Sequence, residues 1–88
     1  MNKIAVIIPA FNEALSIGYV IEAVPNQVHE IIIVDNNSTD ITKDIAKDKG
    51  ATVLFEPKKG YGHACLKGID YLVKDPPDIV VFLDGDYS

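Results

Sequence analysis

Residues 4–8 read IAVII, and residues 9–13, which follow directly, read PAFNE. Three further short runs, mostly apolar, each lead into polar residues, and they cover positions 31–34, 52–55 and 79–83. All but the third of the four runs are uninterrupted and rich in Val and Ile, which is typical of strands buried on both faces of a parallel sheet. The runs therefore predict four strands.

Helical spacing of apolar residues fills the segments between the runs. Residues 17–24 have apolar side chains at i, i+3, i+4 and i+7, with Ser16 as a candidate N-cap. A second helix is expected around residues 41–46, with Ser38 or Asp40 as its cap. Both segments are long enough to cross from one predicted strand to the next.

A third helix is expected over residues 65–73, with an apolar stripe that includes Cys65. Gly50 marks the end of the second helix as a C′ glycine, and the pair Pro76-Pro77 ends the third. The order is then βαβαβαβ. This alternation predicts an α/β protein with one parallel sheet, helices on its faces and right-handed crossovers, forming a single domain over residues 1–88.

The composition narrows the class of partner. The 88 residues carry eight basic and thirteen acidic side chains, so the net charge of −5 argues against a nucleic-acid partner. One cysteine excludes an intrachain disulfide and a Cys-based zinc cluster. The apolar runs are too short for a membrane span or a signal-peptide core, so a cytoplasmic location is expected.

The polar residues after the strands predict a site. In a parallel sheet they gather at one edge, here called the carboxyl edge, where ligands of open α/β sheets bind. The carboxylates expected at this edge are Glu13, Asp35, Asp84 and Asp86. Lys58, Lys59 and Gly60 follow the third strand. An acidic edge beside a basic loop with a glycine predicts a divalent cation and a phosphorylated ligand.

Each part of this edge also has a simpler interpretation. Asp84 and Asp86 bracket a glycine and can bind Mg²⁺ or Mn²⁺, but Asp-Gly is also a common turn. Asp35 could make an Asx-turn or cap a helix. The five residues after Asp35, at positions 36–40, are all polar and exceed what one cap requires, so we expect Asp35 to face the ligand.

Residues 58–63 read KKGYGH and form a basic loop at the expected N-terminus of the third helix, where backbone N–H groups favour anions. The loop matches neither a Walker loop nor a dinucleotide fingerprint, and a solvated turn is the alternative. Tyr61 could stack on a base or sugar, or be half-buried in a turn. His29 and His63 have no partner at a suitable spacing, and Cys65 is expected in the core.

Four segments together resemble inverting glycosyltransferase family 2, which has the GT-A fold, and in particular a bacterial branch close to the dolichyl-phosphate sugar synthases. The matching segments are residues 6–13 (VIIPAFNE), 32–40 (IIVDNNSTD), 56–64 (EPKKGYGHA) and 80–86 (VVFLDGD). They span nearly the whole chain. The resemblance implies the three-layer, Rossmann-like N-terminal half of the GT-A fold, with strand order 3-2-1-4 and a switch point between the first and fourth strands.

The resemblance also implies roles for single residues. The segment that matches Pro9 to Glu13 walls the nucleoside pocket, and the residue that matches Asp35 binds the base or ribose. The residue that matches Asp86 coordinates the metal, Mg²⁺ or Mn²⁺, on the donor diphosphate, and Asp84 supports the ribose or the metal. The edge and the resemblance together predict these nucleotide-binding residues: Pro9, Ala10, Phe11, Glu13, Asp35, Lys59, Gly60 and Asp84.

The implied activity is transfer of a hexose from a UDP- or GDP-sugar to an acceptor such as a polyprenyl phosphate or a cell-envelope glycan, at the inner face of the membrane. The catalytic base is expected in sequence beyond Ser88, so we expect this chain to bind nucleotide weakly and to catalyse little. Asn36-Asn37 replaces the family's usual Asp/Asn-Gly pair. An open sheet edge would also allow self-association.

Two other functions are compatible with the same edge. A sugar-phosphate nucleotidyltransferase would need a Gly-rich loop with Arg after the first strand, and residues 9–13 do not provide one. A non-catalytic module that binds nucleotides or partners through the carboxyl edge is the second alternative. An acidic base motif downstream of residue 88 would favour the enzyme.

Overall fold

A computed structural model describes residues 2–85 of the chain. Its elements, in chain order, are β1 (Ile4–Ala10), α1 (Ile17–Ala23), β2 (Glu30–Asp35), α2 (Thr42–Asp48), β3 (Thr52–Phe55), α3 (Tyr61–Leu72) and β4 (Ile79–Phe82). This order confirms the predicted βαβαβαβ alternation. In this part of the chain no helix is both long and apolar enough to cross a membrane.

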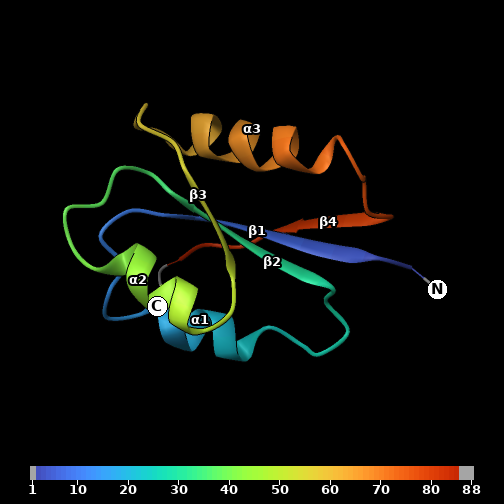
Figure 1. Ribbon diagram of the computed structural model, residues 1–88, viewed down its shortest axis with the longest axis horizontal. Helices are drawn as coiled ribbons and strands as arrows, with labels where there is room; N and C mark the ends of the chain where they lie inside the picture. Colours follow the sequence, from blue (N-terminus) through green and yellow to red (C-terminus); the bar gives the residue numbers. More distant parts are fainter. Residues whose placement is uncertain (1, 86–88) are drawn as a thin grey trace.

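The strands form one parallel sheet in the order β3-β2-β1-β4, with helices on both faces. Figure 1 shows α1 and α2 on one side of the sheet and α3 on the other. Side chains of β1 alternate between the two cores: Val6 and Ile8 pack on the α1–α2 side, while Ala5 and Ile7 pack on the α3 side. The three layers and the 3-2-1-4 strand order are therefore as predicted.

The position of α3 follows from the direction in which the chain crosses the sheet. From β1 to β2 to β3 the chain moves one way, and from β3 it returns past β2 and β1 to β4. Because crossovers between parallel strands are right-handed, the return places its helix on the opposite face. The winding thus reverses beside β1, which is the kind of switch point where open α/β sheets bind ligands.

The two neighbours of β1 accompany it over different lengths. Pairing with β2 continues to Ala10, opposite Asp35, but pairing with β4 stops at Ile7, opposite Phe82. The last bond on that side joins the Leu83 N–H to the Ile7 carbonyl at 3.0 Å. Beyond this point β1 continues, among the described residues, without strand pairing on the β4 side.

The helix ends follow the sequence signals in part. Gly50 has φ +87° and follows α2 as its C′ residue. Its N–H bonds the Lys47 carbonyl at 3.0 Å, and the Ala51 N–H bonds the Ala46 carbonyl at 3.2 Å, which is the Schellman pattern. Ser16 stands at the N-cap position of α1, but its side chain makes no capping bond. Its hydroxyl is used elsewhere, at the carboxyl edge.

The predicted apolar stripe of α3 is wrong in most positions. The helix begins four residues earlier than expected and buries Ala64, Gly68 and Leu72, whereas Leu66 and Val73 are exposed and Cys65 is only partly buried. Small residues face the sheet because α3 lies close against β1: a Cβ at Gly68 would stand 2.8 Å from Ile7 Cγ2. The spacing identified the helix but not the face it buries.

The expectation that β4 is buried on both faces is also wrong for the described part of the chain. Every residue of β4 is about two-fifths exposed, from 38% for Val80 to 41% for Ile79. Only β1 pairs with β4, and α3 covers the sheet mainly over β1 and β2. Self-association through this open, apolar edge stays a prediction.

The close contact of α3 with β1 generates a stability prediction. Gly68→Ala should lower the free energy of unfolding by about 1–3 kcal/mol, because the new methyl group overlaps three atoms of the fully buried Ile7, a β-branched side chain with little freedom to move. Urea unfolding followed by circular dichroism measures the change. Gly62→Ala is the matched control, since a Cβ there meets nothing within 4 Å on the same helix. Equal stability of the two variants would contradict the packing described here.

Candidate nucleotide site at the carboxyl edge

A pocket of about 300 Å³ lies at the carboxyl edge, where β1 and β4 separate. It is lined by residues from the ends of three strands and from the start of α3: Pro9, Ala10, Phe11, Glu13, Asn36, Tyr61, Asp84 and Gly85. Five of the predicted nucleotide-binding residues are among them, namely Pro9, Ala10, Phe11, Glu13 and Asp84. The predicted convergence of the first and fourth strand ends is therefore present.

Gly85 packs directly against the end of β1. A Cβ at this position would stand 3.2 Å from both Ala10 Cβ and the Pro9 carbonyl oxygen, and 3.3 Å from Glu13 Cγ. The Ser16 hydroxyl bonds the Gly85 carbonyl at 2.8 Å and lies 3.1 Å from Glu13 Oε2. A side chain at Gly85 would crowd the end of β1, and the Ser16 hydroxyl holds the backbone of the loop that carries Asp84.

The loops that follow β1 and β2 are bonded to each other. Asn12, which has φ +51°, accepts a bond from the Thr39 N–H at 2.8 Å, and its own N–H bonds Ser38 Oγ at 2.8 Å. The Glu13 N–H bonds Thr42 Oγ1 at 2.9 Å. Most of the polar residues after β2 therefore hold the loop that carries Phe11 and Glu13.

Asp40 belongs to the same set of bonds. Its carboxylate accepts the Ala14 N–H at 3.2 Å, the Thr42 N–H at 2.9 Å and the Thr42 hydroxyl. Desolvation raises the pKa of Asp40, but the bonds from Thr42 and Ala14 outweigh it, so the pKa lies below its ordinary value. Of the two predicted caps of α2, Asp40 bonds the first turn, while Ser38 bonds the neighbouring loop.

Asp35 is the predicted residue whose surroundings differ most from the expectation. It is only 2% exposed and is not part of the pocket lining. Its Oδ1 accepts the Ser38 N–H at 3.3 Å, a local side-chain-to-backbone bond that spans three residues, one more than an Asx-turn. The surplus of polar residues after Asp35 is explained by the bonds between loops, and a contact from Asp35 to a base or ribose stays a prediction.

Asn36 is a pocket residue that the sequence did not single out. Its side chain is bonded to the backbone of the loop after β3: Nδ2 donates to the Glu56 and Lys58 carbonyls at 2.9 and 2.7 Å, and Oδ1 accepts the Gly60 N–H at 2.9 Å. The only sequence signal was its place directly after a strand, which it shares with Asp35. Ser16 was noticed, but as a helix cap.

The basic loop lines the pocket with Tyr61 and contacts the pocket residue Phe11 through Lys59, while neither Lys59 nor Gly60 lines the pocket itself. Lys59 Nζ lies 4.4 Å from the ring centroid of Phe11, within the range of a cation–π contact. Tyr61 lines the pocket, as one of its two interpretations required. Partial burial, the neighbouring Cys65 thiol and the charge of Asp84 raise the pKa of Tyr61, so its hydroxyl stays protonated at neutral pH. Gly60 has φ +127°, and Lys58 lies away from this pocket.

The ionisable groups that line the pocket suit a hard cation. Glu13 and Asp84 both contribute carboxylate oxygens, the donors that Mg²⁺ and Mn²⁺ prefer. Within residues 2–85, however, no three His, Cys, Asp or Glu side chains lie close enough together to hold a metal. Asp86, the predicted principal ligand, lies outside the described residues. Glu13 and Asp84 offer the right kind of donor, and metal binding by Asp84 together with Asp86 stays a prediction.

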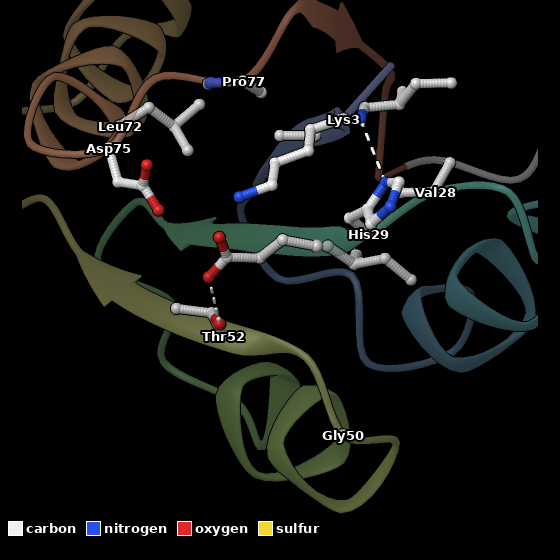
Figure 2. A pocket seen from close by; sticks show the side chains of 12 residues that line it. Lys3, Val28, His29, Gly50, Thr52, Leu72, Asp75 and Pro77 are labelled. Atoms are coloured by element: carbon white, nitrogen blue, oxygen red, sulfur yellow. Dashed lines mark hydrogen bonds between the residues drawn. The ribbon is translucent and has the colours of Figure 1, made fainter. Parts of the chain in front are cut away.

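A larger pocket, of about 550 Å³, lies at the opposite edge of the sheet (Figure 2). Polar groups here form hydrogen bonds between the amino ends of neighbouring strands, and one bond joins α3 to β2. Glu30 accepts the Thr52 and Tyr71 hydroxyls, both at 3.0 Å, and His29 Nδ1 accepts the Ile4 N–H at 3.3 Å. Because the amino ends of parallel strands are not where such sheets bind ligands, we assign the candidate site to the smaller pocket.

Comparison with known sequences agrees with this geometry. Residues 5–88 match the model of the family described as glycosyl transferase family 2. An uncharacterized glycosyltransferase of Mycobacterium tuberculosis is 40% identical over 87 residues, which are 99% of this chain and 38% of that protein. Protein RfbJ of Shigella flexneri is 40% identical over 86 residues, 96% of this chain and 64% of its own length. The chain thus spans about two-fifths of the mycobacterial relative.

Solved structures show the same fold. Glucosyl-3-phosphoglycerate synthase of M. tuberculosis, in complex with Mn²⁺, uridine diphosphate (UDP) and glucosyl-3-phosphoglycerate, has a TM-score of 0.80 and 34% identity, covering 97% of this chain and 34% of the synthase. The same enzyme has been crystallised with Mn²⁺, UDP-glucose and phosphoglyceric acid, at a TM-score of 0.79. Four strands in the order 3-2-1-4, a pocket at the switch point and a family match over nearly the whole length lead to one conclusion: the chain belongs to glycosyl transferase family 2.

Proposed function

We propose that this chain forms the donor-binding part of an inverting, metal-dependent hexosyltransferase that uses a UDP-sugar. The observation that carries the proposal is the pocket between β1 and β4, which brings Glu13 and Asp84 together with the aromatic side chains of Phe11 and Tyr61. UDP is preferred to GDP because the synthase that shares the fold binds UDP and UDP-glucose. The domain 1–88 is, in this proposal, one part of a longer enzyme.

The pocket residues divide the binding between them. Phe11 and Tyr61 offer flat apolar faces to the base or sugar, and Pro9 and Ala10 supply the backbone wall. The Lys59 ammonium, beside the Phe11 ring and just before α3, would donate hydrogen bonds to the diphosphate. Asp84 and Asp86 would hold Mg²⁺ or Mn²⁺. When bound, the metal neutralises charge on the leaving diphosphate.

The reaction that we propose is a single displacement at the sugar carbon. Asp84 and Lys59 orient the donor, and the neutral Tyr61 hydroxyl is available to donate a hydrogen bond. A carboxylate base from beyond Ser88 would accept the proton of the acceptor hydroxyl, and none is needed if the acceptor is a phosphate such as a polyprenyl phosphate. Such an acceptor would place the enzyme in the cytoplasm, at the inner face of the membrane.

The metal site is tested by titrating the chain with UDP, with and without Mn²⁺, by isothermal calorimetry. UDP binding should depend on Mn²⁺, and Asp84→Asn and Asp86→Asn should each weaken it by about tenfold or more, because each removes a carboxylate charge from the cation. Asp48→Asn is the control, since that carboxylate is exposed on α2, far from the carboxyl edge. Metal-independent UDP binding that survives both substitutions would refute the proposed donor site.

The contact of Gly85 with β1 predicts a second effect. Gly85→Ala should weaken Mn²⁺-dependent UDP binding by about fivefold, because a methyl group 3.2 Å from the Pro9 carbonyl forces the loop with Asp84 away from β1. The same titration measures it. Gly62→Ala, which adds a methyl group in open space at the start of α3, should leave the affinity within about twofold of the original. If Gly85→Ala binds as tightly as Gly62→Ala, this loop does not position the metal.

A further inference from the structure

The side chain of Asn36 is used entirely on the loop of residues 56–60. Its amide donates to two backbone carbonyls, those of Glu56 and Lys58, and accepts the Gly60 N–H, so both of its N–H groups are occupied. The residue is 7% exposed although it lines the pocket. Asn36 therefore offers a ligand almost nothing directly, and its place in the site needs another explanation.

We propose that Asn36 is a positioning residue that holds the loop of residues 56–60 in the shape that presents the Lys59 ammonium to the donor diphosphate. The proposal rests on the proposed function and goes beyond it, because it names a determinant of diphosphate affinity that touches no part of the ligand. The Lys58 carbonyl and the Gly60 N–H, which Asn36 binds, lie on either side of Lys59 in the chain. These hydrogen bonds, here called the Asn36 clamp, therefore fix the backbone that carries the lysine.

The chemistry of the clamp requires an amide. Two carbonyl oxygens face Nδ2, and one N–H faces Oδ1, so the side chain must supply two donors and one acceptor. An aspartate of the same shape has no donor, and its second oxygen would stand 2.9 and 2.7 Å from the two carbonyl oxygens. Asn36→Asp should therefore release the loop by repulsion while preserving the volume of the side chain.

The position of the loop affects the pocket through its other contacts. Lys59 reaches the Phe11 ring, and Gly60, at φ +127°, ends the loop and starts α3, whose first residue, Tyr61, lines the pocket. A displaced loop would move the Lys59 ammonium away from Phe11, whereas the pocket wall formed by Pro9 and Ala10 of β1 would stay in place. The affinity for the donor's diphosphate should therefore depend on Asn36 more strongly than the affinity for its nucleoside does.

The experiment compares UDP and uridine, both with Mn²⁺, by NMR titration of the 88-residue chain. Asn36→Asp should raise the Kd for UDP about tenfold and change that for uridine by less than about twofold. Asn37→Asp is the charge-matched control: it adds the same charge one residue away, on an exposed side chain at φ +67°, where Asp is tolerated. It should bind both ligands almost as the original chain does.

A double-mutant cycle tests whether Asn36 acts through Lys59. If it does, Lys59→Ala weakens UDP binding in the original chain but adds less than about twofold in the Asn36→Asp background. Additive effects would show that Asn36 and Lys59 act independently, and equal losses for UDP and uridine would indicate general damage to the fold; either result would overturn the proposal. Failure of the original chain to bind UDP would overturn the proposed function itself, which is a distinct result.

Hydrogen exchange tests the Asn36 bond in the original chain, so its first measurement needs no variant. In the original chain the Gly60 amide should exchange at least about tenfold more slowly than the Gly62 amide, because Asn36 Oδ1 accepts its hydrogen. In Asn36→Ala, which removes the clamp without adding charge, this protection should disappear. A Gly60 amide that exchanges as fast as that of Gly62 in the original chain would overturn the clamp.

Discussion

The hydrogen bonding of β1 is asymmetric, and the site depends on this asymmetry. β2 accompanies β1 to Ala10, but β4 leaves it after Ile7. The last residues of β1 therefore have one side without a neighbouring strand, and the pocket occupies that side with Pro9 and Ala10 as its wall. The reversal of winding brings β4 next to β1 in the first place, since a chain that continued in one direction would place its fourth strand beside β3.

Most polar residues at the carboxyl edge hold the loops in place. Asn12, Ser38 and Asp40 join the first two loops, and Asn36 joins the second loop to the third. Each such bond contributes about 0.5–1.5 kcal/mol, and loops without regular structure need several of them to keep one geometry. Few polar residues remain free to contact a ligand. The pocket therefore combines a wall of β1 residues, Pro9 and Ala10, with two charged side chains, Glu13 and Asp84.

The sequence was sufficient to predict the elements and the edge of the sheet at which the candidate pocket lies, because strand periodicity and the rule for parallel sheets depend only on local pattern and connection order. Burial was harder to predict. The apolar run of β4 looks the same whether or not a further element covers it, and α3 buries Gly68 because of a contact with Ile7 that lies 61 positions away in the chain. Ser16 shows the same limit: its hydroxyl bonds Gly85, whose proximity no local signal reveals.

Electrostatics connect the composition of the chain with the chemistry of the pocket. The chain carries a net charge of −5, and Glu13 and Asp84 line the pocket, so a diphosphate would meet like charge there. Lys59, whose Nζ lies 4.4 Å from the ring centroid of the pocket residue Phe11, is a nearby cation, but its single charge does not offset the two carboxylates. Two carboxylates beside a diphosphate repel it, and a divalent cation between them turns this repulsion into attraction. The acidic lining would thus be a disadvantage for binding nucleotide alone and an advantage for binding nucleotide with metal, so the charges of the pocket are a physical reason to expect metal dependence.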